Sequence, residues 1–266
     1  MNNNELMPIA QSNDERFEEY AELLIRRDQL NKEAGSYLTA YIKEFGDLIT
    51  KNFEIKLECI KKKKTISYCR RRLNRNLPID PKKMKAEIEK EMMGYYEELK
   101  RMAEENEDAK KAKASGAYRV ERSKKLYHRL AKLIHPDINK KTAENETLKE
   151  LWDRIVDAYH KNDSDELDDL EILVKKAMDE LGEEGIEPDY EDIENRIERL
   201  ERQIGDILTT EPYTYGEMLK DEGKKESYRL KLTDEYEDYV NYLESLEQAL
   251  DDMLSSGGVK VLWKMD

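Results

Sequence analysis

The chain has 266 residues, of which 41 % are charged and only 38 % are hydrophobic, and its net charge is −14. Glycine and proline are scarce, whereas Glu, Lys, Leu and Arg dominate, as they do in long helices and coiled coils. This composition predicts an all-α protein and argues against a compact α/β enzyme, whose turns and strands need more Gly, Val and Ile. The acidic balance argues against nucleic-acid binding by the chain as a whole.

Three sequence features bear on cellular location. Cys59 and Cys69 fall on different faces of a helix, so we expect no local disulfide, and two thiols fit a reducing compartment. No apolar run reaches the roughly 18 residues that a membrane span needs. Residues 1–19 lack the basic and apolar regions of a signal peptide. We therefore expect a cytoplasmic protein without a membrane partner.

The N-terminal part of the chain predicts a helical hairpin. Residues 1–12 are polar, and we expect them to be a disordered leader. Beyond them, apolar residues recur every three or four positions on both sides of a Pro-containing break at 77–81. Asp80 can cap the second helix, and Pro81 suits its first position because that N–H needs no partner. Residues 13–114 are thus predicted to form an antiparallel hairpin with its turn at 77–81.

The middle of the chain predicts a unit of three shorter helices over residues 115–182. Residues 120–134 form an amphipathic helix that ends in a loop. A second helix begins at Thr142 or Asn145, and Asp163 caps a third.

The C-terminal part predicts a second antiparallel hairpin over residues 183–254. Over 193–207, apolar residues alternate in steps of four and three, as in a coiled-coil seam. After a loop at 209–225, an apolar stripe follows the last helix. Residues 255–266 are expected to be a tail.

The most specific pattern surrounds the tripeptide His135-Pro136-Asp137. Pro136 disfavours helix at the residue before it, so the preceding helix is expected to end at His135, with Asp137 on the other side of a rigid residue. On that helix, basic side chains share a face that we expect to remain in solvent, and they are Lys125, Arg129 and Lys132, with Lys124 beside them.

Two facing apolar stripes are expected to form the core of an antiparallel helical pair around this loop. They are Leu126, Tyr127, Leu130, Leu133 and Ile134 on the first helix, and Leu148, Trp152, Ile155, Ala158 and Tyr159 on the second.

These residues resemble the J domain of DnaJ-type co-chaperones. The run from Leu126 to Asp137 resembles the second helix and the His-Pro-Asp tripeptide of that family. Trp152-x-x-Ile155-x-x-Ala158-Tyr159 resembles its third helix. The resemblance covers about 120–165, and it implies a chaperone ATPase of the DnaK type as partner.

Carried over by position, the resemblance implies a role for each residue of the helix and the loop. Lys124, Lys125, Arg129 and Lys132 would dock on an acidic surface of the ATPase. His135, Pro136 and Asp137 would stimulate ATP hydrolysis, with the Asp137 carboxylate contacting an arginine of the partner.

The chain also departs from the family pattern. No Tyr-x-x-Leu-Gly helix precedes the pair, and 163–170 is acidic where the family has a basic motif. Two cysteines cannot build a zinc region of four Cys-x-x-Cys motifs. We expect the missing first helix to be replaced by the end of 81–113 or by 165–181.

A basic segment at 51–75 leaves two interpretations open. It can bind nucleic acid or another anion, or it can be a solvated face that pairs with 163–252, whose net charge is roughly −20. The candidate anion-binding residues are Lys61, Lys62, Lys63, Lys64, Arg70, Arg71 and Arg72.

Catalysis is the least expected function. His128, His135 and His160 lack the spacing of a metal site, and the carboxylates follow helical faces without a pocket-forming pattern. We expect no catalytic residue, metal or cofactor. The leading hypothesis is a J-domain-like co-chaperone or adaptor whose coiled-coil arms bind a client or a second copy. The alternatives are a coiled-coil scaffold with a purely structural hairpin and an accessory protein that binds nucleic acid or anions.

Overall fold

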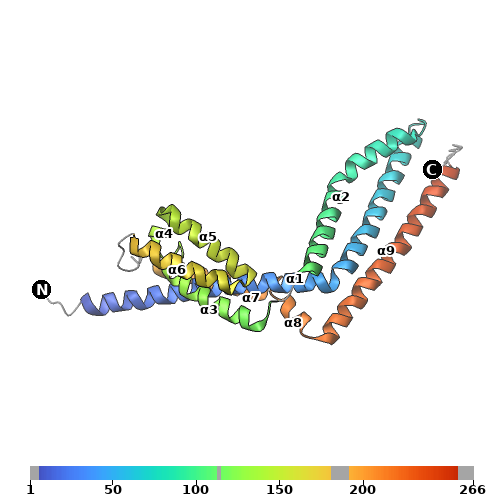
Figure 1. Ribbon diagram of the computed structural model, residues 1–266. Helices are drawn as coiled ribbons and strands as arrows, with labels where there is room; N and C mark the ends of the chain where they lie inside the picture. The colour runs from blue at the N-terminus through green and yellow to red at the C-terminus, as the bar shows by residue number, and fades with distance from the viewer. Residues whose placement is uncertain (1–5, 113–114, 181–191, 257–266) are drawn as a thin grey trace. The chain divides into compact units, whose positions relative to one another are not determined.

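The computed structural model describes residues 6–112, 115–180 and 192–256, and all regular secondary structure in these ranges is α-helical (Figure 1). The predicted all-α class is confirmed. The helices are α1 (Leu6–Leu73), α2 (Pro81–Lys111), α3 (Ala117–Ile134), α4 (Lys140–Glu144), α5 (Glu146–Lys161), α6 (Ser164–Glu180), α7 (Ile193–Thr209), α8 (Tyr215–Leu219) and α9 (Glu222–Ser256).

Helix α1 runs for 68 residues without interruption. It begins at Leu6, so the predicted disordered leader is wrong for 6–12, while 1–5 lie outside the described residues. Pro8 is compatible with this start because it stands in the first turn, where a missing N–H breaks no helical hydrogen bond. The predicted tail is helical up to Ser256, and 257–266 are likewise outside the described residues.

The chain divides into two compact units, and α1 contributes to both. Unit 1 comprises 1–37 and 113–216, and unit 2 comprises 38–112 and 217–266. This differs from the predicted division into 13–114, 115–182 and 183–254. Helix α7 belongs to unit 1 and α9 to unit 2, so the predicted C-terminal hairpin is not formed.

Unit 1 has two hydrophobic cores. Helices α3, α5 and α6 pack pairwise against one another, and α1 adds Ile25 to their core (Figure 1). The first part of α1, together with α6, therefore covers the helical pair, whereas α2 lies in unit 2. The second core explains why the apolar seam of α7 does not pair with α9, since that seam packs on α1. Its buried members are Tyr20, Ala21, Leu24, Ile138, Ile193, Ile197 and Leu200.

Unit 2 contains the part of the predicted N-terminal hairpin from 38 to 112, together with α9, whereas 13–37 belong to unit 1. The Asp80 carboxylate accepts hydrogen bonds from the backbone N–H groups of Lys82 and Lys83, at 3.0 and 3.2 Å, and thereby caps α2. Pro81 occupies the first turn as expected. From this turn α2 runs back along α1, and α9 adds side chains near its own C-terminal end to the core that they share (Figure 1).

Two glycines of α1 offer a matched stability test. A Cβ at Gly35 would meet no atom within 4 Å, so Gly35→Ala should raise the free energy of unfolding by about 0.5–1 kcal/mol through the lower backbone entropy of the unfolded chain. At Gly46, a Cβ would clash with Oδ1 of Asn106. Gly46→Ala must displace that buried amide, which donates to Asp47, and should lower the free energy of unfolding by about 1 kcal/mol. Urea denaturation of both variants measures the two free energies of unfolding. Equal stabilisation by both substitutions would contradict the close contact between Gly46 and Asn106.

Candidate functional site

The His-Pro-Asp tripeptide forms the turn after α3, and hydrogen bonds fix the shape of this turn. His135 ends the helix with extended backbone angles, as a residue before proline should. Its Nδ1 accepts from the backbone N–H of Asp137 at 3.0 Å, and its carbonyl accepts from the N–H groups of Ile138 and Asn139. As an acceptor, Nδ1 carries no proton, so the ring N–H of a neutral His135 is at Nε2.

Asn139 holds the far side of the turn. It is fully buried, and its amide donates to the carbonyl of Leu133 at 3.0 Å while its Oδ1 accepts from the N–H of Lys141. It thus ties the end of α3 to the start of α4. Sequence reasoning missed this residue and its buried neighbour Ile138. The available signal was that asparagine is a preferred N-cap residue directly before a short helix.

His135 points into unit 1. Its side chain is only 7 % exposed, and its ring meets Trp152 edge-on with the centroids 4.7 Å apart. Its Nε2 lies 3.5 Å from Oδ2 of Asp28 on α1. The first member of the tripeptide is therefore part of the packing, whereas Asp137 is exposed.

Asp28 is the residue through which α1 reaches the turn. The hydroxyl of Tyr127 donates to its Oδ2 at 2.8 Å, and Arg27 donates to its Oδ1. Burial raises the pKa of the Asp28 carboxyl, but the hydrogen bonds from His135, Arg27 and Tyr127 outweigh burial and leave this pKa below its ordinary value. A charged carboxylate is thus held between α1, α3 and the turn, a role that the sequence did not indicate.

The expected core residues of the helical pair come together in unit 1. Tyr127 and Tyr159 stack with ring centroids 4.0 Å apart, and Trp152 lies beside Tyr127. Leu133 and Trp152 are only partly buried at the edge of this core. The buried members are Leu126, Tyr127, Leu130, Ile134, Leu148, Ile155, Ala158 and Tyr159.

Lys32 of α1 lies against this aromatic stack. Its Nζ is 3.6 Å from the ring centroid of Tyr159 and 2.6 Å from Oδ1 of Asn162, the residue that caps α5. Burial, followed by repulsion from Lys124, lowers the pKa of the Lys32 ammonium to about 8. Lys32 and Asp28 together attach α1 to the pair at two points.

The basic face of α3 is not free in solvent as expected, because carboxylates of α1 and α6 lie against it. Its side chains remain between 31 and 71 % exposed, so these are surface ion pairs. Lys125 pairs within α3 instead, with Glu121 at 3.6 Å. The other contacts are Lys124 with Glu33 at 3.9 Å, His128 with Glu22 at 3.0 Å, Arg129 with Glu171 at 2.7 Å, and Lys132 with Glu18 and Glu22.

The exposed Asp137 borders a polar cleft of about 390 Å³ between α1 and the start of α7. Arg27, Arg196 and Arg199 also line this cleft. Asp192 lines it too, so two carboxylates and three guanidinium groups share one opening, and the Asp137 carboxylate is accessible from it.

The basic segment in unit 2 pairs with carboxylates of α2 and α9. Lys62 lies 2.9 Å from Glu247, and Lys64 lies 2.6 Å from Glu91. Arg71 contacts Glu87 at 2.5 Å. These pairs agree with the interpretation that the segment is a solvated face with intramolecular partners, although only Glu247 comes from the acidic C-terminal half.

Two other classes of site, a metal site and a membrane span, are absent from the described residues. There, no group of three or more His, Cys, Asp or Glu residues is placed to hold a metal ion. None of the helices in those ranges combines the length and apolar character of a membrane span. Comparison of the chain with protein-family models, curated proteins and solved structures gives no match.

Asp28→Ala should lower the free energy of unfolding by about 2 kcal/mol at pH 7, because it leaves the buried Tyr127 hydroxyl without its acceptor. A carboxyl whose pKa is depressed by folding stabilises the protein above its unfolded pKa and loses that contribution as the pH falls. The difference from wild type should therefore shrink below about pH 4. Denaturant titrations from pH 3 to 7 measure it, with the exposed Asp153→Ala as control. A difference in unfolding free energy between wild type and Asp28→Ala that stays constant across this range would show that the Asp28 carboxylate charge does not stabilise the fold.

Lys32→Met should change how stability depends on pH. Folding lowers the pKa of Lys32 from 10.5 to about 8, so the unfolded chain binds more protons between these values. The wild type should therefore gain stability relative to Lys32→Met as the pH rises from 8 to 10. Paired titrations at pH 8, 9 and 10 test this, and the exposed Lys149→Met should show no such trend. If the difference in unfolding free energy between wild type and Lys32→Met does not change with pH, the Lys32 ammonium of the wild type is fully solvated.

Proposed function

We propose that this chain is a J-domain-like adaptor that docks on a chaperone ATPase of the DnaK type through the His-Pro-Asp turn and α3. Unit 2 then serves as the arm for a client or for self-association. One observation carries the proposal: the turn holds His135 and Asn139 inside unit 1 and leaves the Asp137 carboxylate exposed at the end of a packed helical pair.

The chemistry of Asp137 suits a contact with an arginine. Carboxylate and guanidinium groups form paired, charge-assisted hydrogen bonds whose geometry is specific. The backbone N–H of Asp137 is bonded to His135, so the position of this residue is set before any partner arrives. Such preorganisation lowers the entropy that binding would otherwise lose.

The ion pairs along α3 are compatible with docking. An exposed pair is worth about 0–1 kcal/mol because water and salt screen it. Glu18 and Glu22, which are exposed, can therefore exchange with carboxylates of a partner at little cost in free energy. Because charges on both sides are involved, docking through this face should weaken as salt concentration rises.

The test is a single-turnover ATPase assay with a DnaK-type chaperone. The wild-type chain should accelerate ATP hydrolysis, and Asp137→Asn should lose at least about ten-fold of that acceleration, which corresponds to 1.4 kcal/mol of the activation free energy. Asp153→Asn removes an exposed carboxylate from α5 of the same unit and should act like wild type. His135→Gln is less informative, because His135 is buried and the substitution also perturbs packing.

No acceleration by a folded wild-type chain, or equal acceleration by Asp137→Asn, would reject the proposal. A scaffold is the second candidate. The pairing of α3 with α1 and α6 favours it, since those contacts give the basic face a purely structural role. A gel shift that depends on salt and is lost on neutralising Lys61–Lys64 would instead favour nucleic-acid binding.

A further inference from the structure

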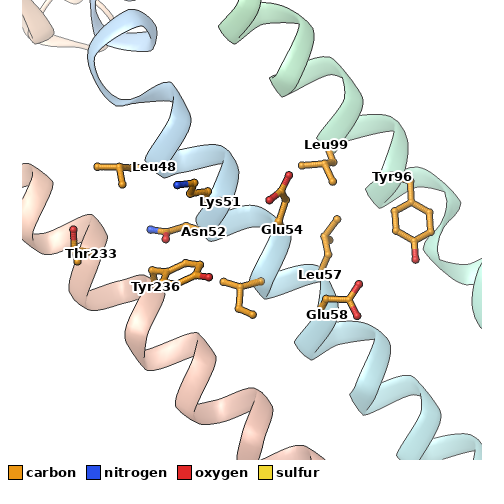
Figure 2. Close-up of a pocket in the computed structure, with 11 residues that line it drawn as sticks. Leu48, Lys51, Asn52, Glu54, Leu57, Glu58, Tyr96, Leu99, Thr233 and Tyr236 are labelled. Carbon is orange, nitrogen blue, oxygen red and sulfur yellow. The ribbon is translucent and has the colours of Figure 1, made fainter. Parts of the chain in front are cut away.

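A groove in unit 2 has no part in the functions considered above. It lies between α1, α2 and α9 and has a volume of about 640 Å³ (Figure 2). Tyr236 is 38 % exposed, and Leu48 and Ile55 are half-buried, so this apolar surface is open to solvent. Its apolar lining consists of Leu48, Ile55 and Leu57 from α1, Tyr96 and Leu99 from α2, and Tyr236 from α9.

The shape of the groove fits a helix. On α1 its lining extends from Leu48 to Glu58, which at about 1.5 Å per residue is a length of roughly 15 Å, or about three helical turns. On the two sides of α1, α2 contributes Tyr96 and Leu99 and α9 contributes Thr233 and Tyr236 (Figure 2). A ligand that fills it lies beside these helices as a further helix, with apolar side chains at three- and four-residue spacing.

Several of the polar side chains that line the groove are hydrogen-bond acceptors. Glu54 lies at its edge, is exposed, and forms no ion pair within the part of the chain that the structure describes. Glu58 lies at the same edge, and its contact with Lys61 is 3.9 Å long. Lys51 is the one basic residue that lines the groove. Two carboxylates against one ammonium give this rim a negative balance.

Asn52 lines the groove as a further acceptor. It is 7 % exposed, and its amide nitrogen donates to the carbonyl of Leu232 at 2.8 Å. This bond fixes the orientation of the amide. In the reverse orientation, Oδ1 of Asn52 would face the carbonyl oxygen of Leu232, and both atoms are acceptors. Its Oδ1 is buried and has no hydrogen-bond partner. Buried polar atoms are nearly always bonded, so this oxygen is an unsatisfied acceptor in the wall of the groove.

We propose that the groove binds an amphipathic helix of a partner protein, with Leu-type side chains along its centre and Lys or Arg at the edge that faces Glu54 and Glu58. The apolar lining drives burial of the central side chains, and the two carboxylates select the cationic edge. This binding site does not rest on the proposed chaperone function, since it lies in unit 2 and needs no ATPase.

The experiment uses the full chain and two fluorescent probe peptides. Both are stapled four-turn helices with the same Leu stripe, and one carries Lys while the other carries Glu at the flanking positions. Fluorescence anisotropy should show saturable binding of the Lys peptide, at least ten-fold tighter than that of the Glu peptide at low salt. The double variant Glu54→Lys/Glu58→Lys should reverse this preference, whereas Glu89→Lys, an exposed change elsewhere on α2, should leave it unchanged.

Ile55→Ser should weaken binding of both peptides, with circular dichroism to show that the variant stays helical. Absence of saturable binding to wild type overturns the proposal, and so does an unchanged preference in the double variant. Concentration-dependent self-association measured by sedimentation, if abolished by Ile55→Ser and unaffected by the Lys peptide, would assign the groove to a second copy and equally overturn it.

Discussion

The structure of unit 1 depends on a partly buried carboxylate of α1. Asp28 accepts from Tyr127 and Arg27 and faces His135, so a single side chain of α1 connects to α3 and to the turn that follows it. A charge in such a position is stable only while its partners remain in place, because an unpaired buried carboxylate is strongly disfavoured. The contact therefore fixes the register of α1 on the helical pair, and Lys32 adds a second point of attachment one turn further along.

This arrangement gives the members of the tripeptide different roles. His135 is occupied with Asp28, Trp152 and the backbone of the turn, so it acts through the shape of the loop. Asp137 projects from that loop and is the group that a partner can reach. In the proposed docking, weak exposed ion pairs along α3 would be exchanged for pairs with another acidic surface.

In unit 2, the charged segment and the exposed apolar groove are two different surfaces. Three members of the basic segment, Lys62, Lys64 and Arg71, pair with carboxylates of neighbouring helices, so part of its charge is balanced within the unit. Part of the exposed apolar surface of unit 2 lies in the groove beside Asn52 and Tyr236. The proposed helix-binding groove and the basic segment are therefore different surfaces of unit 2.

The sequence by itself determined the helical class, the capped turn at Asp80-Pro81, and the end of α3 before Pro136. These features follow from interactions between residues close in the chain, such as amphipathic spacing, capping and the fixed φ of proline. It also identified both apolar stripes of the pair, because each stripe is a local pattern.

Only the tertiary structure decided which stripes meet. The seam of α7 is as regular as a coiled coil requires, yet it packs on Tyr20 and Leu24 of α1 and not on α9. Apolar periodicity shows that a helix needs a partner but carries little information about which one. The same reason explains why Asp28, Lys32 and the carboxylates along α3 were not foreseen. Their roles arise from contacts between residues 42 to 130 positions apart, and only the packing of α1 and α6 on the helical pair creates those contacts.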